Sequence, residues 1–349
     1  MSDSLVCVKD FEKYARLILS RNTLDYYRCG AGDEETLAHN RKAFSKYKIR
    51  PRCLRNVANR DLSTTILGRT VKIPIGVSPT AFQKVIHPDG EYGTARAAEA
   101  MGTVFILSIV ASCTIEELGK AVPNGNNWLQ LYVYADKEFT QTLVKRAEES
   151  NFKALVITVD TPLLGRRLAN IRNKFVVPKH VILPNHMRGR QLFNPSSDWN
   201  DIKWLKSITK LPIILKGILT AEDAIIAADV GVDGILVSNH GGRQLDGSPA
   251  TIEVLPEIVK AVGDRLEVYV DGGITNGSDV FKALALGARM VFMGRAPIWG
   301  LAHSGEEGVK KVLDIVKTEL DGALAIAGSA TLKDIEPGMV VPNSYYSKL

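Results

Sequence analysis

Eight short apolar runs, each bounded by turn residues, recur along the 349-residue chain. Each run is apolar on both faces, as expected for the strands of a parallel sheet that is covered on both sides. The runs are residues 73–77, 104–107, 128–133, 154–159, 213–215, 234–237, 268–270 and 290–293.

Helix-period apolar positions fall between these runs. They cover residues 138–149, 221–229, 251–262, 278–286 and 306–320. Thr114 and Thr220 each precede an acidic residue by three positions, which is typical of a helix N-cap. Eight strands alternating with helices predict an α/β fold, specifically a closed (β/α)8 TIM barrel.

Two stretches depart from this alternation. Residues 161–203 form a long, polar, proline-containing segment after the fourth strand, so we expect an active-site lid or mobile loop there. Residues 1–70 precede the barrel, and we expect helices near 9–20 and 34–44 that close one of its ends. The whole of residues 1–349 is therefore expected to form a single barrel domain.

Composition and charge exclude several classes of protein. The net charge of +6 is spread along the chain with no aromatic-interleaved basic stripe, which argues against a nucleic-acid partner. The four cysteines form no CxxC pair, which favours free thiols over a zinc site. The most apolar run, residues 104–113, is too short to cross a membrane, and the N-terminus does not resemble a signal peptide. Residues 347–349 read SKL, a C-terminal sequence that predicts recognition by the peroxisomal import receptor.

Polar residues follow every predicted strand at its C-terminal end. Barrel enzymes build their active sites from these ends, so we expect the groups to meet at one mouth. They are residues 78–81, Ser108, Gln130 with Tyr132, Thr158 with Asp160, Lys216, Ser238 with His240 and Arg243, residues 271–273, and Gly294 with Arg295.

The ends of the last two strands indicate a phosphate site. The glycines of residues 271–273 and Gly294 let backbone N–H groups approach an oxygen closely, and Arg295 adds a fork of donors. Strands seven and eight are also where barrels usually bind phosphate. The alternative is that these glycines only allow the chain to turn and bind no ligand.

His240 is the candidate base, because imidazole accepts protons near neutral pH. Asp160 is expected to face the same mouth and to stabilise the charged imidazole. A packed or solvated histidine is the alternative. Lys216 ends an apolar run and is costly to bury without a negative charge, so it pairs with a carboxylate, forms a Schiff base or faces a cofactor that becomes anionic.

Several segments of the chain resemble the FMN-dependent 2-hydroxy-acid oxidases, the peroxisomal glycolate-oxidase-like group. The resemblance runs from residue 25 to Gly328 and includes the terminal SKL. The segments that carry it are SNHGGRQLD, LPIILKGILTAEDA, VDGGITNGSDVFKALALGA, QLYVY, TVDTPLLGRR and RPRCLRNV.

The resemblance implies a catalytic set and an FMN site. His240 would be the base, paired with Asp160, and Tyr132 would hydrogen-bond the substrate oxygen. The substrate carboxylate would bind Arg243, Arg167 and Tyr26. The residues implied to hold FMN are Pro79, Thr80, Ala81, Ser108, Gln130 and Thr158 along the isoalloxazine, Lys216 at the flavin N1 edge, Ser238 touching the cofactor, and Asp271, Gly272, Gly273, Gly294 and Arg295 at the ribityl chain and phosphate.

Three departures from the family pattern bear on cofactor and substrate. Thr275 stands where relatives carry an arginine that contacts phosphate. Val110 stands where glycolate oxidases carry tryptophan, so we expect a wider pocket for longer acids. Residues 175–200 are shorter than the family's mobile loop.

The implied reaction is oxidation of L-2-hydroxy acids, with medium or long chains, to 2-oxo acids while O2 becomes H2O2. A homotetramer is also implied. The alternatives are a dehydrogenase that passes electrons to a carrier, a non-redox FMN barrel such as an isomerase, and a catalytically impaired FMN-free homologue. Only Thr275 favours the last of these.

Overall fold

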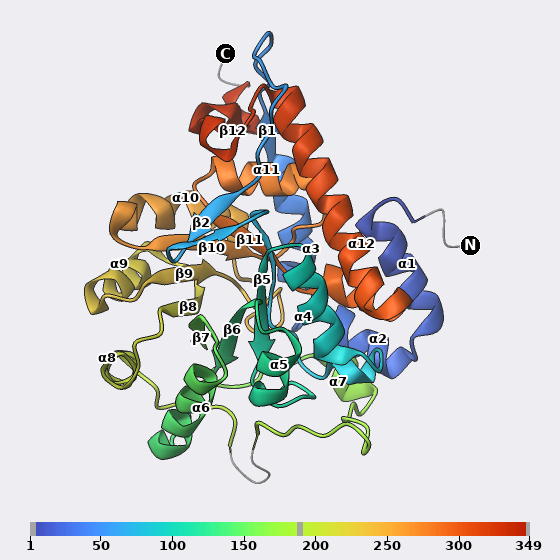
Figure 1. The fold of residues 1–349 in the computed structure, drawn as a ribbon, viewed down its shortest axis with the longest axis vertical. Helices are drawn as coiled ribbons and strands as arrows, with labels where there is room; N and C mark the ends of the chain where they lie inside the picture. Colours follow the sequence, from blue (N-terminus) through green and yellow to red (C-terminus); the bar gives the residue numbers. More distant parts are fainter. Residues whose placement is uncertain (1–4, 187–190, 347–349) are drawn as a thin grey trace.

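A closed barrel of eight parallel strands lies at the centre of the computed structural model, which describes residues 5–186 and 191–346 (Figure 1). The predicted barrel is confirmed, and every predicted strand is present with ends shifted by at most three residues. The order around the barrel is β10, β11, β4, β5, β6, β7, β8, β9. The strands are β4 Ile75–Val77, β5 Val104–Ser108, β6 Asn126–Leu131, β7 Ala154–Thr158, β8 Ile213–Ile218, β9 Gly234–Val237, β10 Glu267–Asp271 and β11 Met290–Met293.

Helices surround the barrel, in agreement with the predicted alternation. Thr114 and Thr220 cap their helices as expected, each accepting a hydrogen bond from the backbone N–H three residues on. These helices are α4 Gly90–Ala100, α5 Ile115–Ala121, α6 Lys137–Glu149, α8 Trp199–Ile208, α9 Ala221–Val230, α10 Thr251–Val262, α11 Gly277–Ala285 and α12 Arg295–Ala327. The last was predicted only over 306–320; it starts at residue 295 and breaks at Ser304 and Gly305, whose backbone is not helical.

The barrel interior is a packed core and contains no channel through its middle. Trp128, Tyr269 and Phe292 are fully buried there, with ring centres 5.6–5.9 Å apart. A hairpin of β2 Thr64–Ile66 and β3 Arg69–Val71 closes the N-terminal end and adds Ile66 and Val71 to this cluster. Ligands therefore reach the barrel from the opposite end, where the strands finish.

The N-terminal segment covers that C-terminal end. It contains α1 Val8–Ile18, α2 Arg21–Arg28 and α3 Glu35–Ala43. The predicted helices near 9–20 and 34–44 are confirmed, whereas α2 was not predicted. α1 packs against α12 and α3 against α10, so the segment becomes a wall of the site. A further pairing, of β1 Tyr47–Ile49 with β12 Val340–Pro342, joins the segment before the barrel to the segment after α12.

The long segment after β7 contains the short helix α7 Leu168–Arg172 and the beginning of α8. Leu164, Arg167 and Phe175 from this segment line the cavity described below. Its role as a lid stays a prediction. The SKL address at residues 347–349 lies outside the described residues, as do residues 187–190.

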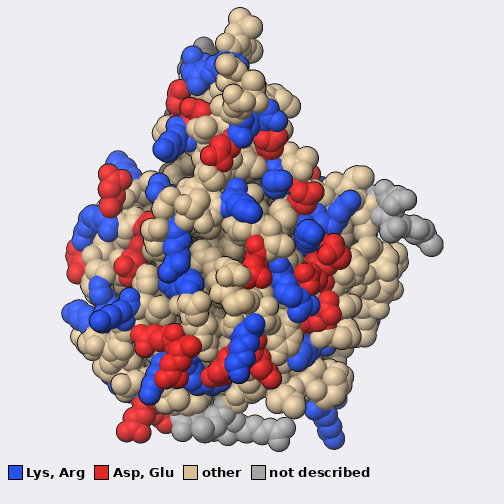
Figure 2. Space-filling view, in the orientation of Figure 1, with Lys and Arg blue, Asp and Glu red and all other residues tan. Residues whose placement is uncertain are grey.

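The surface carries mixed charge. Lysine and arginine side chains alternate with acidic ones over the face seen in Figure 2, so no single-sign patch dominates it. Among residues 5–186 and 191–346, no helix is both long and apolar enough to span a bilayer.

Candidate active site

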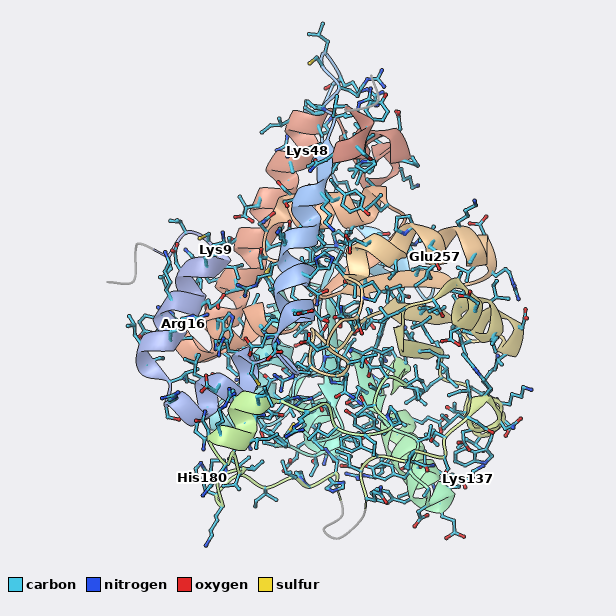
Figure 3. The ribbon with its side chains drawn as sticks, turned by 180° about the vertical axis from the view of Figure 1, so that it is seen from behind. Lys9, Arg16, Lys48, Lys137, His180 and Glu257 are labelled. Carbon is cyan, nitrogen blue, oxygen red and sulfur yellow. The ribbon has the colours of Figure 1, made fainter. Side chains whose placement is uncertain are left out.

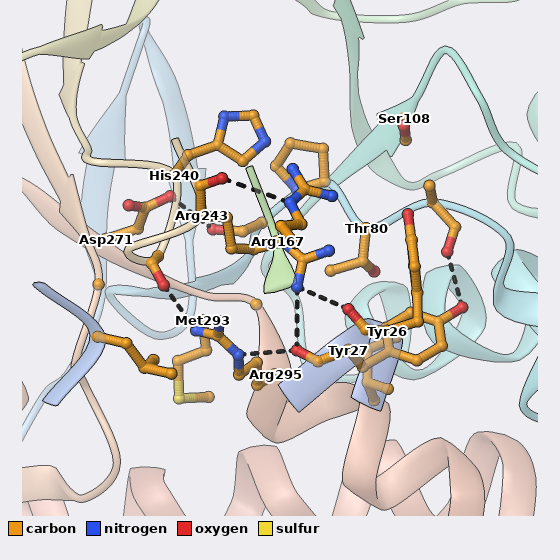
Figure 4. A pocket seen from close by; sticks show the side chains of 18 of the residues that line it. Tyr26, Tyr27, Thr80, Ser108, Arg167, His240, Arg243, Asp271, Met293 and Arg295 are labelled. Carbon is orange, nitrogen blue, oxygen red and sulfur yellow. Dashed lines mark hydrogen bonds between the residues drawn. The ribbon is translucent and has the colours of Figure 1, made fainter. Parts of the chain in front are cut away.

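A cavity of about 690 Å³ opens at the C-terminal ends of the barrel strands, beneath the N-terminal helices. It brings together side chains from all eight strand ends and from α1, α2, α3 and the loop after β7. Figure 4 shows several of them, among them His240, Arg243 and Arg167. Every site residue predicted from the sequence lines this cavity except Asp160 and Ser238. These two lie directly behind it, hydrogen-bonded to His240 and Lys216, which line it.

His240 and Asp160 form a partly buried pair. His240 Nδ1 lies 2.9 Å from Asp160 Oδ1, which also accepts a 2.9 Å hydrogen bond from the Thr161 hydroxyl. The carboxylate is placed to accept a hydrogen bond from Nδ1–H, and this tautomer leaves the lone pair on Nε2. His240 has a φ of 58° and is followed by Gly241 and Gly242, also with positive φ, so the backbone turns sharply to place the ring at the mouth.

Burial sets the protonation of this pair. It lowers the pKa of His240 below its ordinary value of 6.5, and the Asp160 charge opposes the shift only in part. For Asp160, burial alone would raise the pKa, but the His240 charge and hydrogen bond reverse this and lower it. At neutral pH the site therefore holds a neutral imidazole beside an ionised carboxylate.

Two arginines share one side of the cavity with no acidic partner in the described parts of the chain. Arg243 Nη1 donates to the backbone oxygens of Tyr26 and Cys29 at 2.7 and 3.0 Å. Arg167 is 8% exposed, and its Nε donates to the backbone oxygen of Arg243 at 3.3 Å. Burial, together with the Arg243 charge, lowers the pKa of Arg167 to about 10. A buried arginine next to a partly buried one, with no acidic partner for either in the described residues, indicates a site built for an anion.

Lys216 meets a carboxylate, which is one of the partners expected for it above. Its Nζ lies 3.5 Å from Asp271 Oδ2 and donates to the Ser238 hydroxyl at 2.8 Å. The Ser78 hydroxyl also donates to Asp271 Oδ2, at 3.2 Å. The other carboxylate oxygen, Oδ1, is buried and accepts no hydrogen bond from the described residues. An orphaned acceptor of this kind marks a position for a ligand donor.

A chain of polar side chains continues along the wall from β5 to β7. The Ser108 hydroxyl donates to Gln130 Oε1 at 3.3 Å, and Gln130 Nε2 donates to the Thr158 hydroxyl at 3.0 Å. All three are buried at the cavity surface. They provide hydrogen-bonding groups for the edge of a flat polar ring.

At the ends of β10 and β11, where a phosphate site was predicted, the glycine backbone leaves little space for a side chain at Gly273 and carries N–H groups at a helix start. Gly273 has a φ of 82°, and a Cβ at this position would lie 2.2 Å from the Asn40 carbonyl oxygen. Gly294 precedes the first turn of α12, where backbone N–H groups and the helix dipole attract anions. Only the β-carbon of Ser78 and a methyl carbon of Thr80 would lie within 4 Å of a Cβ at Gly294, which leaves room for a ligand.

Arg295 differs from the expectation of a free donor fork. Its three guanidinium nitrogens donate to the backbone oxygens of Tyr27, Gly241 and Cys29 at 2.9, 3.0 and 3.1 Å. Burial and the neighbouring arginines lower its pKa to about 9. Arg295 therefore contributes positive charge and anchors the surrounding loops, while its donors are largely engaged.

Thr275 brings no charge to this end. Its backbone N–H and hydroxyl both donate to Asp279 Oδ2, at 3.0 and 3.1 Å. The interaction completes the start of α11, so the residue has a structural role there.

An apolar wall faces the arginines and His240, and most of it was not predicted. The rings of Tyr26 and Phe175 stack with their centres 4.3 Å apart, and the Phe193 ring meets the Tyr132 ring edge-on at 5.2 Å. The unpredicted apolar residues of this wall are Phe82, Leu164, Ile171, Phe175, Val177, Leu192 and Phe193. Apart from Phe82, which follows β4, these residues lie in the segment after β7, and their place in the cavity depends on how that segment folds back. The sequence of this segment offers no periodic signal.

These features fit FMN. The glycine-rich end can accommodate a phosphate. The buried Asp271 Oδ1 can accept a hydrogen bond from a bound ligand. The polar chain from Ser108 to Thr158 can hydrogen-bond the edge of an isoalloxazine ring. Among the described residues, no cluster of three or more His, Cys, Asp or Glu side chains could hold a metal ion.

Comparisons with known proteins identify the family of the chain. The model of the FMN-dependent dehydrogenase family matches residues 15–342. The mouse 2-hydroxyacid oxidase 1 is 48% identical over 363 aligned positions, covering 98% of both chains. The peroxisomal (S)-2-hydroxyacid oxidase GLO4 of Arabidopsis thaliana is 48% identical over 95% of both chains. A crystal structure of mandelate oxidase with benzoyl-formic acid superposes with a TM-score of 0.92 at 40% identity, covering 96% of this chain and 98% of that one. The chain therefore belongs to the FMN-dependent dehydrogenase family, and its cofactor is FMN.

Proposed function

We propose that the protein oxidises L-2-hydroxy acids to 2-oxo acids and reduces O2 to H2O2. The observation that carries this proposal is His240, paired with Asp160, in the same cavity as two arginines that lack acidic partners among the described residues. An anionic substrate with an oxidisable hydroxyl next to its carboxylate matches this arrangement. The relatives named 2-hydroxyacid oxidase support the same reaction class.

The substrate carboxylate binds Arg167 and Arg243, whose planar guanidinium groups can hold two oxygens at once. This places the 2-position near His240, whose Nε2 takes a proton as the substrate is oxidised. Asp160 stabilises the resulting imidazolium. Burial raises the pKa of the Tyr132 hydroxyl, so this group stays protonated and can donate to the substrate oxygen.

Bound FMN supplies the acceptor for the two electrons that leave the substrate. Lys216, next to Asp271, is placed to stabilise negative charge on the ring. Pro79, Thr80 and Ala81 with the polar chain from Ser108 would line the ring, and the residues around Gly273 and Gly294 would hold the phosphate. Ser238 would act by orienting Lys216.

The reaction is tested by product stoichiometry. In air, purified protein given an L-2-hydroxy acid should form 2-oxo acid and H2O2 in equal amounts. Turnover only with an artificial electron carrier would instead support the dehydrogenase alternative. Absence of flavin from the purified protein, even after FMN is supplied, would support the impaired homologue.

The pH dependence of kcat/KM should follow His240. Because its pKa is lowered and the neutral form is the base, activity should persist at neutral pH and fall only as pH drops below about 6.5. In Asp160→Asn the carboxylate no longer opposes this shift, so the acidic limb should move to lower pH. The plateau should fall about a hundredfold, because the imidazolium loses its partner. A limb that moves to higher pH would contradict the pairing.

We further propose that the pocket accepts medium or long chains. Val110 lines the cavity beside the apolar wall. Val110→Trp should lower kcat/KM for 2-hydroxyoctanoate by a factor of about ten to a hundred, since the indole fills the space for the chain. The value for glycolate should change little, and Val110→Ile serves as the control. A wild-type protein that strongly prefers glycolate would contradict the proposal.

The remaining assignments are proposals of the same kind. Residues 1–349 form one domain that assembles as a homotetramer, and the import receptor reads Ser347, Lys348 and Leu349 to place the protein in peroxisomes. A relative named as peroxisomal supports this location.

A further inference from the structure

One arginine at the phosphate end of the cavity has no role in the site proposed above. Arg41, on α3, lines the cavity together with Glu12 of α1 and Thr275. The preceding residue, Asn40, touches the glycine pair of the phosphate site, since a Cβ on Gly273 would lie 2.2 Å from its backbone oxygen. The Arg41 charge also contributes to lowering the pKa of Arg295, after burial and the Arg243 charge, which is consistent with the two guanidinium groups being neighbours.

Arg41 has donors to offer, whereas those of Arg295 are engaged. Arg41 Nη2 donates to Glu12 Oε2 at 2.9 Å, and within the described chain its Nε and Nη1 make no hydrogen bond. Arg16 Nη2 holds the other oxygen, Glu12 Oε1, at 2.7 Å. Glu12 is 8% exposed, so this carboxylate fixes Arg41 from a buried position. The three side chains together carry one net positive charge.

The charge balance of the site calls for such a residue. A phosphomonoester carries a charge of about −1.5 to −2 at neutral pH. Arg295 supplies one positive charge, and Thr275 supplies none because its polar groups bind Asp279. Without another cation, most of the second phosphate charge would rest on backbone N–H groups and the α12 dipole alone.

We propose that Arg41 binds the FMN phosphate and provides the positive charge that Thr275 lacks, with Glu12 as its positioning residue. The inference rests on FMN as the cofactor and does not depend on the substrate. It assigns a part of cofactor recognition to α3, a helix outside the barrel strands.

The test compares FMN with riboflavin, which has the same ring but no phosphate. Apoprotein is titrated with each flavin, and the dissociation constant is read from flavin fluorescence. Arg41→Gln should weaken FMN binding about tenfold or more, since a charged hydrogen bond is lost, and should leave riboflavin binding unchanged. Arg41→Lys, which keeps the charge without the fork, should fall between wild type and Arg41→Gln.

Arg16→Gln is the matched control, because Arg16 also binds Glu12 but lies at the edge of the molecule on α1 and does not line the cavity (Figure 3). It should leave the affinity for both flavins unchanged. Equal weakening of FMN and riboflavin by Arg41→Gln, or no weakening of either, would overturn the inference. A wild-type protein that binds neither flavin would overturn the FMN site itself.

Discussion

Replacing His240 with glutamine should slow anaerobic flavin reduction by an L-2-hydroxy acid by a factor of about 10²–10⁴. The expected loss is large because His240 is the one histidine among the described residues that line the cavity, and its partner Asp160 lies behind it and does not line the cavity. Glutamine keeps the approximate size and polarity of the side chain, so substrate affinity and the flavin spectrum should change little. The rate is measured by stopped-flow absorbance of the bound flavin.

His39→Gln is the control for this experiment. His39 lies on α3 and pairs with Glu253 outside the cavity, with 2.6 Å between Nε2 and Oε2. Its replacement should leave the reduction rate unchanged. If His240→Gln reduces the rate by less than about tenfold, below the usual range for a general base, proton transfer to His240 would be ruled out as a major contribution.

Replacing Arg167 with methionine should lower kcat/KM for a 2-hydroxy acid by a factor of about thirty to several thousand, equivalent to about 2–5 kcal/mol. Arg167 is buried, and its two terminal nitrogens are free of backbone oxygens in the described residues, so the substrate carboxylate would be their partner. Arg243 is a less clean target, because its Nη1 also holds the end of α2. The measurement is steady-state kinetics, in which most of the loss should fall on KM.

Two comparisons make this prediction specific to charge recognition. Arg172→Met changes an exposed residue of the same short helix, outside the cavity, and should have no effect. A neutral ester of the same hydroxy acid should be oxidised at similar efficiency by wild type and Arg167→Met. Equal losses for acid and ester would show that Arg167 acts through folding and not through the carboxylate.

The barrel could be predicted because its strands are buried on both faces and therefore stand out as uninterrupted apolar runs. Once the strands were placed, the rule that barrel sites form at strand C-termini identified the site residues contributed by the strands. His240, Asp160 and Lys216 are close together because β7, β8 and β9 are neighbours in the barrel.

The covering elements were harder to predict, for physical reasons. α2 has the sequence RNTLDYYR, which is polar on most sides, and only Tyr27 is buried, so no apolar stripe signals a helix. The first part of α12 contains Pro297 and Gly300, which disfavour a helix, and it is followed by a break at Ser304 and Gly305. The sequence of this part therefore showed no clear helical periodicity. Arg41 and Glu12 enter the cavity only through the packing of α1 and α3 over the barrel mouth. Contacts of this kind depend on how helices pack together, so the local sequence pattern does not predict them.

The oxidation of an L-2-hydroxy acid by the flavin-loaded protein is the central claim, and the visible spectrum tests it most directly. Purified protein should show a flavin band that bleaches when an L-2-hydroxy acid of medium chain length is added without oxygen. The D-enantiomer should leave the band unchanged, and admitting air should restore it with formation of H2O2. A flavin band that no L-2-hydroxy acid bleaches would contradict the proposed function.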